Sequence, residues 1–206
     1  HEHADHLGVA YLLGEAISKG TAGFDARGLS DAFDAIGASH GTFTGRETIG
    51  FSSLFLPEFL PRVIELHAEM IRTPTFPEEA CETAVELSRQ SLSALEDDPQ
   101  ELAKKLLHRQ AYGEPLGRHV LGEEASLECI GRQEIVAHWK RHFSAARMLV
   151  SVAGAVEPGA VADLLEDHFA GFQAAEDAAD WFPLRFTPGR SHLDKELEQE
   201  QIALCF

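Results

Sequence analysis

One stretch near the start of the chain constrains the fold more than any other. Between Gly8 and Thr21, apolar residues recur at the i, i+3, i+4, i+7 and i+8 positions, namely Val9, Leu12, Leu13, Ala16 and Ile17. This spacing predicts an α-helix with one buried stripe. Lys19 suits the negative C-terminal end of such a helix, and we expect Gly20 to end it in the left-handed conformation.

The other side of the same predicted helix carries a second pattern. Tyr11, Gly14 and Glu15 stand at i, i+3 and i+4, so these positions share one face. Zinc hydrolases with an HxxEH motif hold histidine, glutamate and histidine at those three positions. The predicted helix therefore has the spacing of a zinc site and different residues in it.

Further along, the sequence alternates between helix and strand signals. Two short runs on either side of Gly45-Arg46 predict a β-hairpin, with strands at 38–43 and 49–55. Cap residues and apolar periodicity predict helices in six regions, 25–37, 57–73, 77–97, 99–113, 135–143 and 158–171. Alternating apolar residues predict further strands at 148–152 and 202–206. This order indicates an α+β fold, with helices layered on one face of a largely antiparallel sheet.

The charge balance limits the partners that the chain can have. The formal charge is −17, from 17 Lys and Arg against 34 Asp and Glu. Such a surface repels phosphate backbones and anionic lipid, so we expect neither nucleic acid nor a membrane as a partner. A basic peptide is compatible with it. No apolar run approaches the length of a membrane span, and the three widely spaced cysteines suggest no disulfide framework.

Several histidines offer an alternative metal site. His1, His3 and His6 are close together but follow no helical register, which favours a solvated end of the chain. His67 lies on the apolar stripe of the helix expected at 57–73, which favours a histidine at the edge of the core over a ligand. His108 has no paired ligand at helical spacing.

Seven short motifs together suggest a family. They are, in order, 8–10, 19–21, 33–37, 44–48, 74–79, 96–99 and 115–122. With them the chain resembles the pitrilysin/insulinase family of zinc metallopeptidases, which includes mitochondrial processing peptidase. The resemblance runs from about Gly8 to Gly171 and on to Phe206.

The resemblance implies a domain organisation. In this family each half of the protein is an α/β domain, and two halves or two subunits close around a peptide chamber. Residues 1–172 then correspond to the N-terminal peptidase-like domain without its first strand, and residues 173–190 to a linker. Residues 191–206 correspond to the start of the next half-domain or to an added strand.

The resemblance also locates the zinc site. Tyr11 and Glu15 stand where the family has its two histidine ligands, and Ser91 where it has its third ligand, a glutamate. Gly14 replaces the general base, and Ala84 replaces a supporting glutamate. Zinc hydrolysis needs three ligands and a base, so we expect no zinc in this chain and zinc only in an active partner.

The first strand of the hairpin is the expected peptide contact. Gly41, Thr42, Phe43 and Thr44 stand where active members have an Asn-Ala-x-Thr strand, to which peptides add by main-chain pairing. Tyr11 and Glu15 are further candidates for peptide contact. In this interpretation, the chain is an inactive domain that pairs with an active zinc peptidase homologue, or a second half-domain, and helps to enclose peptide.

Two other functions are alternatives to this one. In the first alternative, the chain is a purely structural interface subunit, as non-proteolytic family members are in respiratory complexes. Otherwise it would be an active zinc endopeptidase that uses His67, His108 or the cluster of His1, His3 and His6.

Overall fold

We describe the structure from a computed structural model that covers residues 2–172, 185–195 and 200–206. The α-helices in these ranges are α1 (Val9–Ala16), α2 (Ala26–Asp34), α3 (Leu60–Arg72), α4 (Glu78–Glu96), α5 (Pro99–Tyr112), α6 (Glu124–Leu127), α7 (Arg132–His142) and α8 (Pro158–Phe169). The strands are β1 (Ser39–Thr44) and β2 (Ile49–Leu54), and short 3₁₀ turns are η1 (Ala4–His6), η2 (Pro57–Phe59) and η3 (Ala145–Arg147). The α+β class is therefore confirmed, as is the hairpin.

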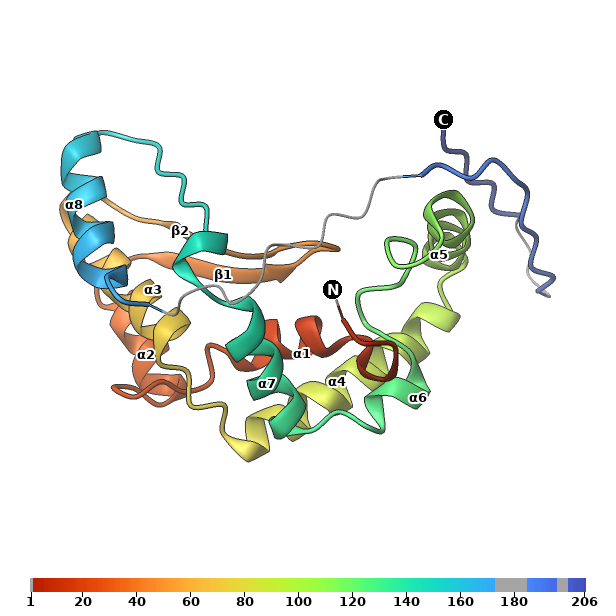
Figure 1. The fold of residues 1–206 in the computed structure, drawn as a ribbon, viewed down its shortest axis with the longest axis horizontal. Helices are drawn as coiled ribbons and strands as arrows, with labels where there is room; N and C mark the ends of the chain where they lie inside the picture. The colour runs from red at the N-terminus through yellow and green to blue at the C-terminus, as the bar shows by residue number, and fades with distance from the viewer. Residues whose placement is uncertain (1, 173–184, 196–199) are drawn as a thin grey trace.

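The helices and the hairpin form a layered arrangement. Helix α1 packs against α4, α7 and β1, and α3 packs against α8 and α2 (Figure 1). Strands β1 and β2 are antiparallel, with Thr42 opposite Phe51 and Thr44 opposite Ile49. The outward face of the hairpin is open, since Phe43 and Leu54 are 59% and 77% exposed. Helices thus cover one face of this sheet, as predicted.

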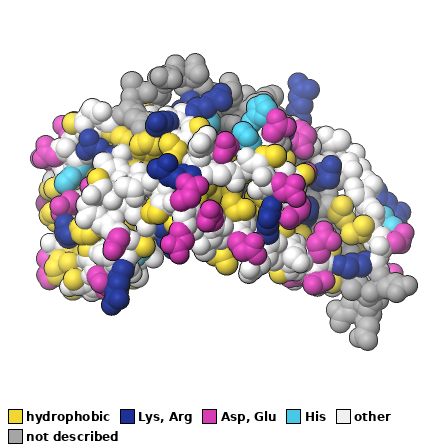
Figure 2. Space-filling model, turned by 90° about the horizontal axis from the view of Figure 1, so that it is seen from below, with side chains coloured by type: hydrophobic (Ala, Val, Ile, Leu, Met, Phe, Trp, Pro, Cys, Tyr) yellow, Lys and Arg dark blue, Asp and Glu magenta, His cyan; other side chains and the backbone are white. Residues whose placement is uncertain are grey.

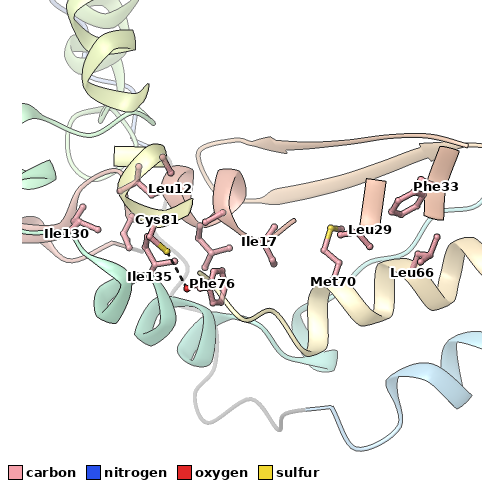
Figure 3. Close-up of a cluster of buried hydrophobic side chains, with 14 of the residues drawn as sticks. Leu12, Ile17, Leu29, Phe33, Leu66, Met70, Phe76, Cys81, Ile130 and Ile135 are labelled. Atoms are coloured by element: carbon pink, nitrogen blue, oxygen red, sulfur yellow. Dashed lines mark hydrogen bonds between the residues drawn. The ribbon is translucent and has the colours of Figure 1, made fainter. Parts of the chain in front are cut away.

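The apolar stripe of α1 is at the centre of the core. Leu12, Leu13, Ala16 and Ile17 have no exposed surface and Val9 has 2%. Leu12 and Ile17 lie with Cys81 of α4 and Ile135 of α7 in one cluster (Figure 3). Burying one large apolar side chain stabilises a fold by roughly 1.5–3 kcal/mol, so this stripe holds three helices together.

The end of α1 differs from the prediction. The helix ends at Ala16, and Gly20 is not among the glycines with positive φ. A Cβ at Gly20 would lie 2.6 Å from Thr75 Oγ1, so Gly20 permits a close approach to the segment before α4. The left-handed glycine is at the other end of the helix, where Gly8 has φ 95°. A Cβ there would lie 2.6 Å from the Leu121 carbonyl oxygen.

The local signals of α2 are confirmed. The Asp25 carboxylate accepts a hydrogen bond from the Gly28 amide at 2.7 Å, as an N-cap does. Gly37 has φ 63° and follows the helix in the left-handed conformation. These two residues limit the helix, as the sequence indicated.

Two expected strands are missing from the sheet. Residues 148–152 and 202–206 lie outside any strand, so the described sheet has two strands rather than the larger sheet expected. A strand needs the N–H and C=O groups of a neighbour, and alternation reports only which face a residue occupies. Leu149 is 96% exposed, so its side chain also lacks the apolar neighbours that would cover one face of a strand. Most of the expected linker lies outside the described residues, and the division into 1–172, 173–190 and 191–206 stays a prediction.

The surface agrees with the acidic composition. Figure 2 shows one face on which acidic side chains are mixed with Lys and Arg side chains. Within the described ranges, no helix is both long enough and apolar enough to span a membrane.

Candidate functional site

The contact between α1 and the hairpin occupies the expected position of the catalytic base. Gly14 is buried, and a Cβ built on it would lie 2.5 Å from Thr44 Oγ1 and 3.7 Å from Thr42 Cγ2. Real Cβ atoms do not approach a neighbour at 2.5 Å, so any side chain at position 14 requires Thr44 to move. The position therefore has no side chain that could act as a general base, and the Thr44 side chain of β1 packs directly against it.

Tyr11 and Glu15 remain on the half-buried side of α1. Burial, followed by the negative charge of Glu15, raises the pKa of the Tyr11 phenol above its ordinary value of 10. The phenol is therefore protonated at neutral pH and offers a hydrogen-bond donor rather than a phenolate ligand. Glu15 is the single carboxylate among the three ligand positions.

Helix α4 packs against α1, as the resemblance implies, but supplies no ligand from the expected positions. The Ser91 hydroxyl donates to the Leu87 carbonyl at 2.8 Å, which is a bond within its own helix. Ala84 is 3% exposed and belongs to the core. One carboxylate, a neutral phenol and a committed hydroxyl do not fit the three nitrogen, sulfur or carboxylate ligands that zinc requires.

The described residues contain no ready metal site elsewhere. Within 2–172, 185–195 and 200–206, no three His, Cys, Asp or Glu side chains are placed to hold one ion. His67 Nε2 lies 2.7 Å from Ser53 Oγ, and burial, with His40 nearby, lowers the His67 pKa to about 4. Its partial burial beside Phe33 agrees with a histidine at the edge of the core.

The other histidines have different surroundings. His108 Nδ1 lies 2.7 Å from Arg46 Nη2, and burial, followed by this cation, lowers the His108 pKa. His3 and His6 lie near α7, whereas His1 is outside the described residues. In the described part of the chain, neither His67 nor His108 has two further ligands beside it. The cluster of His1, His3 and His6 stays a prediction, since His1 is not described.

Strand β1 presents the predicted peptide contacts on two faces. Thr42 and Thr44 face Gly14 of α1. Gly41 and Phe43 alternate with them and lie on the other face, where the Phe43 ring covers Gly50. In the described residues, β1 pairs with β2 alone, so one edge of β1 has no strand neighbour. That Tyr11, Glu15 and residues 41–44 contact peptide stays a prediction.

The structure also joins features that the sequence left separate. Arg46 Nη1 donates to the carbonyls of Leu116 and Arg118, at 2.5 and 2.8 Å, and so ties the hairpin turn to the loop at 113–122. His138 and His142 of α7 lie with ring centroids 4.3 Å apart. Their i, i+4 spacing on α7 is the sequence signal for this pair.

Comparison with protein families covers nearly the whole chain. Residues 1–124 match the model of insulinase, peptidase family M16. Residues 130–206 match the model of the peptidase M16 inactive domain.

The curated relatives have low sequence identity to this chain but match most or all of its length. An uncharacterized zinc protease of Rickettsia felis is 25% identical over 207 residues, which are 100% of this chain and 50% of the relative. Cytochrome b-c1 complex subunit 1 of Rattus norvegicus is 26% identical, over 100% of this chain and 44% of its own. Mitochondrial-processing peptidase subunit beta of Homo sapiens is 27% identical, over 82% of this chain and 35% of its own. The chain thus spans about half the length of these relatives, or less.

Solved structures share the fold. A protease from Helicobacter pylori has a TM-score of 0.78 at 17% identity, over 90% of this chain and 46% of that chain. A peptidase M16 inactive domain from Pseudomonas fluorescens has a TM-score of 0.75 at 20% identity, over 85% of this chain and 44% of that chain. With the insulinase model matching more than half of its residues, the chain belongs to the insulinase family of peptidases, family M16.

Proposed function

We propose that this chain is a catalytically inactive, non-zinc-binding domain of the M16 family. It pairs with an active zinc peptidase homologue, or with a second half-domain, and helps to enclose or recognise peptide. The observation that carries the proposal is Gly14, which has no side chain where the family has its general base and which packs directly against Thr44. Because Tyr11 is a neutral phenol and Ser91 bonds to its own helix, Glu15 alone cannot hold zinc tightly.

Two features support a role in peptide recognition. The edge of β1 that has no strand neighbour among the described residues has the main-chain groups that strand addition uses. The formal charge of −17 favours peptides with basic residues. In this proposal, Tyr11, Glu15 and residues 41–44 line the peptide, and zinc is supplied only by the partner.

Metal analysis of the purified chain tests the absence of zinc at α1. We expect no zinc that depends on Tyr11 or Glu15. The proposal is overturned by stoichiometric zinc that is lost in Glu15→Ala or Tyr11→Ala and retained in Glu79→Ala. Glu79 is an exposed carboxylate on α4, so its variant controls for loss of charge alone.

Native mass spectrometry tests the pairing. The chain is mixed with an M16 homologue that carries an intact HxxEH helix, and we expect a one-to-one complex. Peptide cleavage by that complex should weaken when Thr42 is replaced by Pro, because the Thr42 N–H lies on the edge of β1 away from β2 and proline removes that donor. Absence of any complex with active homologues from the native source would contradict the proposal.

A second function is a purely structural subunit. The similarity to a subunit of the cytochrome b-c1 complex favours it. Co-purification from the native source separates the two functions. A partner with an intact HxxEH helix supports the recognition role, and a partner without one supports the structural role.

A further inference from the structure

The tip of the hairpin is tied to a part of the chain that lies far away in sequence. Arg46, in the turn between β1 and β2, is exposed, yet its guanidinium has three acceptors on other elements. Its Nη1 donates to the carbonyls of Leu116 and Arg118, and its Nη2 lies 2.7 Å from His108 Nδ1. Figure 1 shows the hairpin tip reaching toward α5 and the loop that follows it, where these acceptors lie.

The loop at 113–122 is itself fixed to the rest of the domain. It begins directly at the end of α5. Near its other end, the Ser88 hydroxyl of α4 donates to the Leu121 carbonyl at 3.2 Å. A Cβ on Gly8, just before α1, would lie 2.6 Å from the same carbonyl oxygen, so the loop also packs closely on the start of α1. The loop therefore connects α1, α4 and α5, and Arg46 joins the hairpin to them.

Arginine suits this contact better than lysine does. Its planar guanidinium donates from separate nitrogens in a fixed fork, so one side chain reaches the carbonyls and the histidine ring together. Hydrogen bonds from a charged donor are stronger than those between neutral groups. Glu47 and Thr48, which complete the turn, are exposed. The bonds of Arg46 are therefore what holds the tip against the loop.

The contact fixes the strand to which the proposed function assigns the peptide. The N–H groups of Thr42 and Thr44 lie on the edge of β1 away from β2, which has no strand neighbour among the described residues. At one point this strand is held by the packing of Thr44 on Gly14, and beyond it the tip is held by Arg46. Groups that are ordered only when a ligand binds reduce its affinity, so an edge ordered in advance binds more tightly.

We propose that Arg46 is a positioning residue, which holds the free edge of β1 in place for an extended peptide by bonding to the 113–122 loop and to neutral His108. The inference rests on the proposed function, because peptide addition at β1 belongs to it. Arg46 itself need not touch the peptide.

His108 makes this hold sensitive to pH. Because a guanidinium only donates, His108 Nδ1 is the unprotonated nitrogen of a neutral ring. Protonation places a second cation beside Arg46 and removes the acceptor. Burial, followed by the Arg46 charge, lowers the pKa of His108 below its ordinary value of 6.5, so the hold is complete above pH 6.5 and weakens as the pH falls through the folded pKa. The titratable and charged groups around the ring are Arg46 of the hairpin, Glu101, Lys104 and Tyr112 of α5, and His119 of the loop.

Hydrogen exchange of the full chain tests the hold by itself. In Arg46→Gln, the protection factors of the Phe43 and Gly45 amides, which face β2 near the tip, should fall about fivefold or more. Arg46→Lys should restore part of the loss. The control is Arg27→Gln, which removes an exposed arginine paired with Asp31 on α2 and should leave the hairpin unchanged. Unchanged protection in Arg46→Gln overturns the proposal.

Peptide binding tests what the hold is for. The probe is a rhodamine-labelled decapeptide of alternating Lys and Thr, whose positive charge suits a chain of formal charge −17. Its Kd should rise about threefold or more in Arg46→Gln and stay unchanged in Arg27→Gln. The natural chain should bind it more weakly at pH 5 than at pH 7.5. His108→Phe keeps a ring beside Tyr112 but has no acceptor, so it should bind weakly at both pH values.

The outcomes separate this inference from the proposed function. A natural chain that does not bind the peptide contradicts the proposed function, and the positioning role of Arg46 with it. Equal Kd values in the natural chain and in Arg46→Gln leave the proposed function standing and overturn this inference alone. An affinity that falls equally between pH 7.5 and 5 in the natural chain and in His108→Phe overturns the part of His108.

Discussion

The two sides of α1 differ: one has the apolar residues of a packed core, and the other has the spacing of a zinc site without its residues. On the core side, Val9, Leu12, Leu13, Ala16 and Ile17 are all buried, and they join the hairpin to α4 and α7. On the other side, Tyr11, Gly14 and Glu15 occupy the HxxEH positions without a base or a histidine ligand. Packing and catalysis place separate demands on one helix, and under the proposed function only the demands of packing are met here. The comparison predicts large effects of mutation on the first side and small effects on the second.

The largest effect is expected from Leu13→Ala. Leu13 has no exposed surface, and truncating such a leucine removes transfer energy and leaves a cavity. We expect the free energy of unfolding to fall by about 2–5 kcal/mol. Urea denaturation followed by circular dichroism measures it. A loss below about 1 kcal/mol would mean that the stripe is not the centre of the core.

His67 of α3, at the edge of the core, extends the comparison to pH. The His67 pKa is about 4 in the fold, below the ordinary histidine value of 6.5, so the folded state favours the neutral ring. The stabilisation is complete above pH 6.5 and is lost as the pH falls through the folded value. The difference amounts to about 2–3 kcal/mol. His67→Leu should reduce the fall in unfolding free energy between pH 7 and 4, and His138 and His142, whose pKa values are also lowered, account for the slope that remains.

Comparison with a second variant controls this measurement. His192→Leu changes an exposed ring and should leave the curve unchanged. If the natural chain and His67→Leu lose equal stability on acidification, the ring of His67 is not buried in its neutral form.

Gly14 lies where the two sides of α1 meet, and its substitution should have an intermediate effect. Glycine to alanine in a helix usually gains about 0.5–1 kcal/mol, but the new Cβ meets Thr44 Oγ1. Overpacking of this kind costs about 1–3 kcal/mol, so Gly14→Ala should be destabilising. Thermal and urea unfolding of Gly14→Ala measure the sign.

Two variants separate the contact from helix propensity. Gly159→Ala lies on α8 with nothing within 4 Å of the new Cβ, and it should be neutral or stabilising. In a Thr44→Ala background, Gly14→Ala should also cease to be destabilising. A Gly14→Ala chain that is more stable than the natural one would show that Thr44 does not pack tightly against position 14.

The local parts of the fold could be predicted from the sequence, and the non-local parts could not. Asp25 and Gly37 delimit α2 because caps depend on neighbours within a few residues. The prediction that Gly20 ends α1 in the left-handed conformation was wrong, because its close contact is with Thr75, far along the chain. The strand expected at 148–152 failed because pairing needs a partner that alternation does not identify.

The candidate site divides in the same way. Helical spacing together with the family resemblance places Tyr11, Gly14 and Glu15 at the HxxEH positions. That Thr44 fills the space beside Gly14 required the position of β1. The His138/His142 pair follows from helical spacing, but its meeting with His3 required the packing of α1 on α7.

The smallest effects of mutation are expected on the side of α1 that carries Tyr11 and Glu15. Tyr11→Phe and Glu15→Gln keep the size of each side chain, which is half-buried, and remove the hydroxyl or the charge. Changes of this kind outside a buried network are usually within about 0.5 kcal/mol, so unfolding in urea should hardly change. The pKa of Tyr11 should fall towards its ordinary value in Glu15→Gln, because the second cause of its rise is the Glu15 charge. Ultraviolet titration of the phenol measures this shift. An unfolding free energy lowered by about 2 kcal/mol or more in either variant, close to the loss expected for Leu13→Ala, would show that this side also carries the fold.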